Sequence, residues 1–161
     1  MKDPVIIYAN PSFFNNITFT SRTYGSNPLY FVTIVFTSLK AADHSTKVDF
    51  YSYAYIASTN TYMKSIEIHL NWCDFIYDQS IFTSVLKEKY IKEAAICPAP
   101  PGSYHFENMT APYGRYLKNF PFQQGRVYIN VTLNNELIYT SRLDLQVKEM
   151  PAEKFHKYAD D

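Results

Sequence analysis

The residues of this sequence best suited to chemistry are its cysteines and histidines, and their spacing limits what they can do. Cys73 and Cys97 have 23 residues between them, and the four histidines are far apart: His44, His69, His105 and His156. The sequence contains no HExxH, CxxC, CxxH or GxSxG motif. Only four glycines are present, too few for a glycine-rich phosphate loop. We therefore expect no catalytic residue, no metal site and no cofactor, and we interpret His69 and His105 as solvated strand residues.

The two cysteines predict one disulfide, Cys73–Cys97, because three N-glycosylation sequons indicate a secreted protein. The sequons begin at Asn16, Asn108 and Asn130, and none has proline in the middle. Secreted proteins fold where disulfides form and persist. The first residues, MKDPVIIY, lack the apolar core of a signal peptide, so the chain is either cytosolic or a mature form. The sequons and cysteines favour an extracellular glycoprotein.

Charge and hydropathy exclude two classes of partner. The 15 basic residues balance the 15 acidic ones, and the densest charged stretch, KEKYIKE, alternates in sign. A nucleic-acid-binding protein needs a basic field, so we expect no nucleic-acid partner. No run of 18 apolar residues is present, so we expect no integral membrane segment.

The elements that must position these residues are mostly strands. Hydrophobic residues make up 47% of the chain and aromatic residues 17%, mostly Tyr and Phe, which suit a pleated, half-buried surface. Alternation and turn signals predict eight strands. They are Val5–Ala9, Ile17–Thr23, Leu29–Leu39, Lys47–Ala57, Tyr62–Leu70, Tyr104–Asn108, Arg126–Leu133 and Leu137–Val147.

One segment has helical rather than strand periodicity. Phe82, Leu86 and Tyr90 recur at intervals of four, which predicts an amphipathic helix over about 79–92. Residues 150–161 are polar, and we interpret them as a C-terminal tail outside the core of the domain. The whole chain, 1–161, predicts a single all-β domain: an immunoglobulin-like antiparallel sandwich of two sheets with one inserted helix.

The inward faces of these elements supply many apolar side chains that could form a ligand site. They are Phe31, Phe36, Phe50, Ile66, Ile68, Leu70, Phe82, Leu86, Phe106, Ile129, Val131 and Tyr139. Two sheets that splay apart can hold an apolar ligand between them, whereas closely packed sheets bury the same side chains in a solid core. Periodicity alone favours the solid core.

A family resemblance favours the cavity instead. Residues 72–146 contain a cysteine followed by an aromatic residue, the helix, a Cys-Pro pair and two later strands. These elements are Cys73-Asp74-Phe75, Cys97-Pro98, Gly102-Ser103-Tyr104, Pro121 and Gly125-Arg126-Val127-Tyr128. Their order resembles a large insect family of secreted proteins related to the ganglioside-activator branch of the ML lipid-recognition domains, a group that includes the CheB-type chemosensory proteins. This chain departs from those domains in having cysteines for a single disulfide.

The resemblance implies a sandwich that carries or presents a lipid or other hydrophobic small molecule, lined by the twelve apolar residues above. Tyr51, Tyr53 and Tyr55 are candidates for polar groups at its rim. A second hypothesis is a secreted interaction module with a solid core, in which the tyrosine-rich face of Lys47–Ala57 contacts a receptor protein. An enzyme is the third and least favoured hypothesis, since no catalytic motif supports it.

Overall fold

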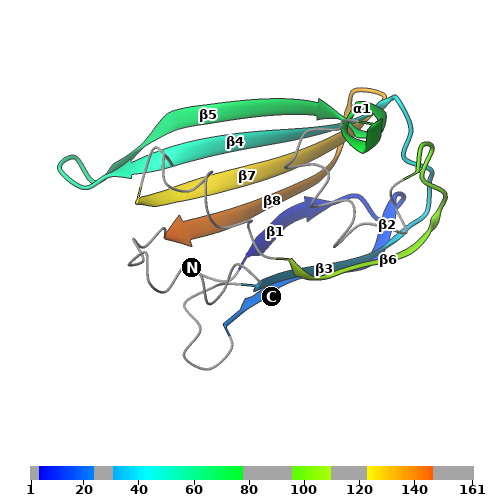
Figure 1. The fold of residues 1–161 in the computed structure, drawn as a ribbon, viewed down its shortest axis with the longest axis horizontal. Helices are drawn as coiled ribbons and strands as arrows, with labels where there is room; N and C mark the ends of the chain where they lie inside the picture. The colour runs from blue at the N-terminus through cyan, green and yellow to red at the C-terminus, as the bar shows by residue number, and fades with distance from the viewer. Residues whose placement is uncertain (1–3, 24–30, 78–95, 110–122, 147–161) are drawn as a thin grey trace.

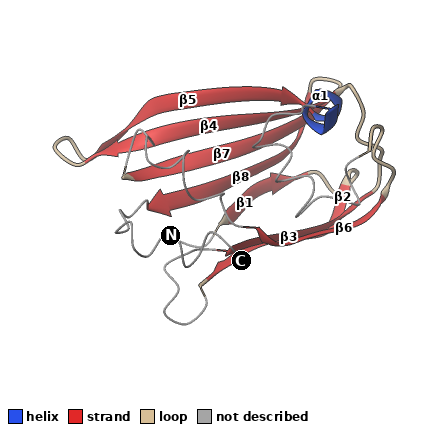
Figure 2. Cartoon of the chain, viewed as in Figure 1, coloured by secondary structure: helices blue, strands red, loops and turns tan. Residues whose placement is uncertain are grey.

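The fold is an antiparallel β-sandwich. The computed structural model describes residues 4–23, 31–77, 96–109 and 123–146. Within these ranges the chain forms eight strands and one short helix, and the strands lie in two layers that face each other (Figure 1; Figure 2). The all-β sandwich predicted from residue alternation is confirmed.

The larger sheet has five strands in the order β1-β8-β7-β4-β5. Their bounds are β1 Val5–Ala9, β8 Glu136–Gln146, β7 Gln124–Leu133, β4 Thr46–Ile56 and β5 Thr61–Asn71. Every neighbouring pair is antiparallel. The β7–β8 hairpin turns through Asn134 and Asn135, which have φ values of 51° and 65°. Asparagine tolerates positive φ well, and two-residue hairpin turns of this kind require it.

The smaller sheet has three strands in the order β2-β3-β6, which are β2 Phe14–Arg22, β3 Phe31–Ser38 and β6 Gly102–Met109. Both pairs are antiparallel and both contain a β-bulge. Asn16 and Asn108 lie at these irregularities with φ values of 51° and 53°. All eight predicted strands are therefore present, with ends that differ by a few residues. The helix predicted over 79–92 and the tail 150–161 lie outside the described residues.

The one helix that the structure describes, α1 at Trp72–Tyr77, directly follows β5. Asn71 caps it, because its Oδ1 accepts hydrogen bonds from the backbone N–H groups of Cys73 (3.0 Å) and Asp74 (3.4 Å). Asp74 lies in the first turn, where the helix dipole favours a negative charge. The helix buries Cys73 and Ile76. The sequence analysis did not predict α1.

The disulfide Cys73–Cys97 is confirmed, with a Cα–Cα distance of 5.4 Å. It joins α1 to the segment that leads into β6, and so connects the end of the larger sheet to the start of the smaller sheet's last strand. A second link lies nearby, where Ala42 and Ala99 exchange two backbone hydrogen bonds of 2.9 and 2.8 Å. The two sheets are therefore held together most directly at the α1 end of the sandwich.

A small buried cluster lies at this end of the sandwich. Phe13, Leu133 and Ile138 form it, with Phe14 and Val131 packed against them. Ile138 is buried because β8 has a bulge: Val131 lies opposite Tyr139, but Thr132 lies opposite Leu137. The extra residue breaks the alternation and leaves Leu137 43% exposed. Alternation along the predicted strand Leu137–Val147 puts Leu137 on the same apolar face as Tyr139, and that placement is wrong because of this bulge.

Candidate functional site

A cavity of about 140 Å³ lies between the two sheets at the α1 end. The larger sheet contributes Thr46, Val48, Val131, Leu133 and Ile138, and the smaller sheet contributes Phe14, Phe36, Ser38, Tyr104 and Phe106. The remaining lining residues come from the connecting segments and α1: Phe13, Lys40, Ala41, Ala42, Trp72, Ala99 and Pro100. Lys40 and Pro100 are exposed, so the cavity reaches the surface beside them.

The strand registers explain why these side chains meet. Thr46 pairs with Leu133 and Val48 with Val131, so the start of β4 and the end of β7 place alternate residues on one inner face. Across the sandwich, Phe36 pairs with Tyr104. The pairs in the larger sheet and the pair in the smaller sheet all lie at the end of the sandwich where α1 and the disulfide are found. The cavity is therefore a property of this end and not of the whole interface between the sheets.

The wall on the smaller sheet is built from aromatic rings. The Phe36 ring lies 5.6 Å from that of Phe14, 5.5 Å from Tyr104 and 5.8 Å from Phe106, measured between ring centroids. Two of these pairs are edge-to-face, with interplanar angles of 84° and 74°. Aromatic pairs favour this geometry, so the wall has a defined shape before any ligand arrives.

Most polar groups around the cavity already have partners. The Tyr104 hydroxyl donates a hydrogen bond to the Pro100 carbonyl, and burial raises its pKa, so it remains a donor. The Ser38 hydroxyl donates to the Lys40 carbonyl (2.6 Å), and Thr46 Oγ1 accepts from the Asp43 backbone N–H (3.1 Å). Trp72 Nε1 differs, because it is buried and has no hydrogen-bond partner in the described part of the chain. The lining contains no acidic side chain among the described residues.

Three of the twelve residues proposed from sequence line this cavity, namely Phe36, Phe106 and Val131. Phe50 and Ile129 pair with each other one step farther along the same inner face, and do not line it. Tyr139 is buried beside the cavity, with its ring 6.1 Å from that of Phe14.

The other proposed residues lie elsewhere. Phe31, Ile66 and Leu70 are half-buried and do not line the cavity, and Ile68 is 46% exposed. Phe82 and Leu86 lie outside the described residues. The sequence analysis missed six large lining side chains: Phe13, Phe14, Trp72, Tyr104, Leu133 and Ile138. A sequence signal was present for Phe13 and Phe14, because two adjacent aromatic residues shortly after the Asn10-Pro11 turn indicate a buried segment.

Tyr51, Tyr53 and Tyr55 lie on the opposite face of β4 from Val48 and do not line the cavity. Their rings contact neighbours on the outer face of the larger sheet: Tyr51 with His69, Tyr53 with Tyr128, and Tyr55 with Tyr62. The suggestion that they orient a head group at the rim of this cavity is therefore wrong.

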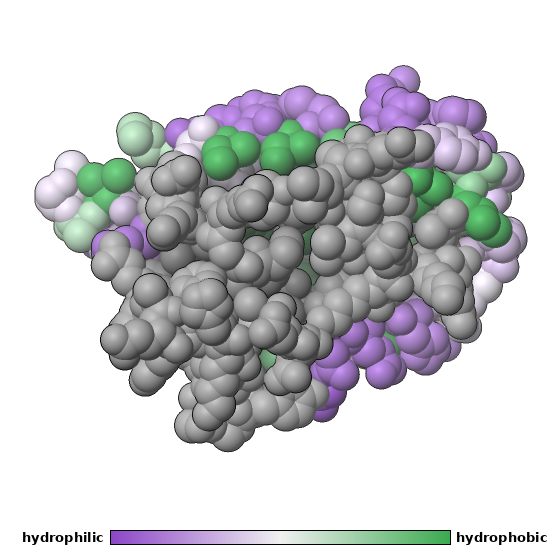
Figure 3. Space-filling model, viewed as in Figure 1, coloured by the Kyte–Doolittle hydropathy of each residue, from purple (hydrophilic) through white to green (hydrophobic). Residues whose placement is uncertain are grey.

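Charged groups on this outer face pair with one another. His69 Nδ1 lies 2.7 Å from Asp49 Oδ1, and its Nε2 lies 3.1 Å from Glu67 Oε1. Glu67 also pairs with Lys64. The Asp49 contact raises the pKa of His69, chiefly through the hydrogen bond, with burial opposing it. Figure 3 shows hydrophilic residues gathered along the upper edge of the molecule, where Figure 1 places β5.

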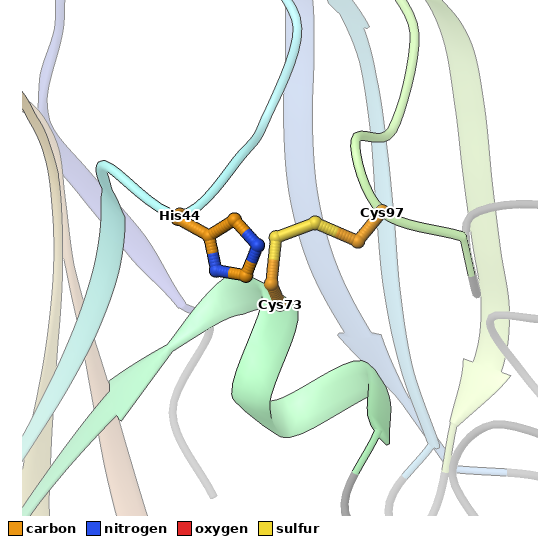
Figure 4. A group of neighbouring side chains, drawn as sticks. All are labelled: His44, Cys73 and Cys97. Carbon is orange, nitrogen blue, oxygen red and sulfur yellow. A yellow bond between two sulfur atoms is a disulfide. The ribbon is translucent and has the colours of Figure 1, made fainter.

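One side-chain group has the composition of a metal site. His44, Cys73 and Cys97 bring a ring nitrogen and two sulfur atoms within 4.8 Å of one another, and Figure 4 shows the imidazole beside the disulfide. Metals bind thiolates, and here both sulfur atoms are bonded to each other. In this oxidised form the group is a disulfide with a neighbouring histidine. His105 lies 3.7 Å from Glu107 on an exposed strand surface, and His156 is outside the described residues.

The three sequon asparagines differ in their surroundings. Asn16 is exposed on β2. Asn108 is half-buried, and its Oδ1 accepts a hydrogen bond of 2.7 Å from Arg22. Asn130 lies within β7, between β4 and β8, and its Oδ1 is buried without a partner among the described residues. The surface around Asn16 is the most open to a glycan.

Comparison with known proteins adds no relative. No model of a protein family matches the chain, and no curated protein matches it in sequence. In the described ranges, no helix is long and apolar enough to cross a bilayer.

Proposed function

We propose that the protein is a secreted carrier or presenter of a lipid or other apolar small molecule, which binds in the cavity between the two sheets. The observation that carries this proposal is the lining: apolar and aromatic side chains from both sheets surround a space that reaches the surface beside Lys40. Ligand sites in proteins are typically concave, mostly apolar and largely preformed, with a few placed polar groups. The resemblance of residues 72–146 to ML lipid-recognition domains supports the same function.

The size of the cavity suits one apolar group or the end of a hydrocarbon chain. Its 140 Å³ is close to that of an engineered apolar cavity of about 150 Å³ that takes up benzene. Binding would be driven by removing apolar surface from water, at about 25 cal/mol per Å². The disulfide supports the secreted part of the proposal, because structural disulfides persist in oxidising compartments.

The alternative, a protein-contact module that uses the tyrosine-rich outer face, has weaker support. Tyr51 already has a ring contact with His69 and carries the Lys64 ammonium 5.3 Å from its ring centroid. The acidic groups beside it are paired with His69 and Lys64. These internal contacts occupy the rings and charges of the outer face, whereas none of the described residues fills the cavity between the sheets.

A cavity-filling substitution tests the proposal. Val131→Phe adds a ring at the cavity wall, while Val127→Phe adds the same ring to the same face of β7 away from the cavity. Uptake of the fluorescent probe N-phenyl-1-naphthylamine and native mass spectrometry of the purified protein would measure binding. We expect the wild type and Val127→Phe to bind, and Val131→Phe to lose binding at least tenfold, which corresponds to about 1.4 kcal/mol.

Folding is checked separately by circular dichroism and thermal unfolding. Ala42→Leu adds volume to the cavity lining from a connecting segment. This variant replaces Val131→Phe in the binding test if Val131→Phe does not fold. A wild-type protein that takes up no apolar probe and purifies without a bound lipid would overturn the proposed function. Undiminished binding by a folded Val131→Phe or Ala42→Leu protein would show that the ligand does not occupy this cavity.

A further inference from the structure

The charge at the cavity comes from one side chain. Lys40 is the single charged residue in the lining as far as the structure is described. Its Nζ lies 4.2 Å from the ring centroid of Phe13, which is 7% exposed and itself lines the cavity. An ammonium group is attracted to the face of an aromatic ring. This contact places the cation against the cavity wall, at the surface end of the cavity.

The Lys40 ammonium has no acidic partner among the described residues, whereas two other cationic side chains are paired with carboxylates. Lys64 pairs with Glu67, and Arg126 pairs with Asp144. An ammonium offers three hydrogen-bond donors and no acceptor. Lys40 is therefore a donor group at the cavity that the described protein leaves available.

A second donor at the cavity is also unpaired. Trp72 lines the cavity, and its buried Nε1 has no partner in the described part of the chain. The indole N–H can only donate, and a buried donor without an acceptor is unfavourable. The hydroxyl groups of Ser38 and Tyr104 are already engaged with backbone carbonyls. Among the described residues, the lining thus combines two donors without partners, one of them cationic, and has no acidic side chain.

Building on the proposed function, we infer that the cavity selects a single-chain amphiphile whose head group is an anionic oxygen group, a carboxylate or a phosphate. The ammonium of Lys40 binds the head group at the surface end, and the hydrocarbon chain enters the aromatic-walled space. Hydrogen bonds between a charged donor and an oxyanion are stronger than neutral ones. A neutral alcohol gains less from Lys40, and a quaternary ammonium is repelled by it.

Trp72 provides the measurement, because it is the only tryptophan in the chain. Its fluorescence emission is therefore a direct report on cavity occupancy. Four amphiphiles with the same twelve-carbon chain would be titrated below their micelle concentrations: dodecanoate, dodecyl phosphate, 1-dodecanol and dodecyltrimethylammonium. We expect dodecanoate, at a pH where it is ionised, to bind at least tenfold more tightly than dodecanol, and dodecyltrimethylammonium to bind most weakly.

Variants of Lys40 assign the preference to this residue. Lys40→Gln is expected to reduce the dodecanoate-to-dodecanol affinity ratio to about one, chiefly by weakening dodecanoate binding, and Lys40→Arg is expected to preserve the ratio. Lys47→Gln is the matched control, since Lys47 is an exposed lysine on the opposite face of β4 from the cavity. It should change neither affinity.

The outcomes separate this inference from the function on which it rests. Equal binding of dodecanoate and dodecanol, or an unchanged ratio in Lys40→Gln, overturns the anionic head-group assignment while the apolar-ligand function stands. Absence of binding by every one of the four amphiphiles, together with no uptake of the apolar probe, overturns the function itself. Comparable binding of dodecyl phosphate assigns the shared oxyanion, and binding of dodecanoate alone assigns the carboxylate; either result supports the inference.

Discussion

Arg126 of β7 and Asp144 of β8 form a two-point ion pair across their hairpin. Arg126 Nε donates to Asp144 Oδ1 at 2.6 Å, and Nη2 donates to Oδ2 at 3.2 Å. The guanidinium also lies 4.5 Å from the ring centroid of Tyr62 on β5. Since β4 separates β7 from β5, this one side chain links strands on both sides of it. The hydrogen bond to Asp144 raises the pKa of Arg126, and an arginine side chain stays protonated in proteins in any case.

The first prediction concerns the strength of this pair. The Arg126 and Asp144 side chains are only 23% and 18% exposed, so water screens them incompletely. We expect a coupling energy of about 1–2 kcal/mol in a double-mutant cycle of Arg126→Ala and Asp144→Ala, measured by urea unfolding. The more exposed pair Lys64–Glu67 is the control and should show a clearly smaller coupling. Equal couplings for the two pairs would contradict this ranking.

The second prediction is a pH dependence of stability centred on His69. Its folded pKa is raised, chiefly by the hydrogen bond to Asp49, with Glu67 adding to the effect. A raised folded pKa means that the stabilisation is fully present below the unfolded value of about 6.5, and is lost as pH rises through the folded pKa. Between pH 6 and pH 8.5 the wild type should therefore lose more stability than His69→Gln.

An NMR titration of the His69 ring protons measures the pKa directly. The groups that face the ring are Asp49, Glu67 and the aromatic ring of Tyr51, with Lys64 close to Glu67. Asp49→Asn should lower the His69 pKa, because it removes the charged acceptor of the Nδ1 hydrogen bond. A wild-type pKa at or below about 6.5 would show that the pair does not form in solution.

The third prediction tests the β8 bulge. Ile138 is 4% exposed and belongs to the buried cluster, whereas Leu137 beside it is 43% exposed. Ile138→Ala should lower the free energy of unfolding by about 2–4 kcal/mol, and Leu137→Ala by less than about 1 kcal/mol. Denaturant unfolding of the two variants gives the comparison. The reverse order would mean that β8 follows simple alternation and has no bulge at this position.

The fourth prediction concerns the disulfide. Cys73 and Cys97 are 24 positions apart, and closing a loop of this size stabilises by roughly 3 kcal/mol in the chain-entropy model. We expect the Cys73→Ala/Cys97→Ala double variant to lose about that much stability. The reduced wild type serves as the control, and its urea midpoint should fall with that of the double variant. A loss below about 1 kcal/mol would count against a stabilising role for the bond.

The fifth prediction ranks the sequons. In protein secreted from a eukaryotic host, Asn16 should carry most of the glycan, because it is exposed, and Asn130 should carry none, because its Oδ1 is buried within the larger sheet. Enzymatic deglycosylation followed by peptide mass spectrometry identifies the modified sites. Asn16→Gln should abolish the largest mobility shift. A glycan at Asn130 in folded protein would contradict the position of its side chain.

Alternation predicted the strands well because each sheet has an inner and an outer face. It also placed Val131 correctly on the face shared with Ile129, yet only Val131 lines the cavity. Residue parity identifies the face of a strand but not the position along it. That position depends on where the sheets, α1 and the disulfide meet, which involves contacts between distant parts of the chain.

Two other parts of the site could not be read from local patterns. Ile138 became a lining residue through a bulge, and a bulge depends on the register with the partner strand. Trp72 begins a six-residue helix in which four residues, Trp72, Phe75, Ile76 and Tyr77, are of types common in strands. The only local sequence signal for this helix is Asn71, because asparagine is a favourable N-cap residue. Asparagine is also common in turns, so this signal does not distinguish a helix from a turn.

The cavity draws its lining from Phe13 near one end of the chain to Ile138 near the other, with contributions from both sheets. The binding site exists only in the folded protein, because its residues come from distant parts of the chain. Ligand binding and folding are therefore thermodynamically linked. At a free ligand concentration 100 times its dissociation constant, this linkage adds about 2.7 kcal/mol to the free energy of unfolding. The bound ligand would then act as a stabilising component of the protein, and its release would lower the free energy of unfolding of the carrier by a measurable amount.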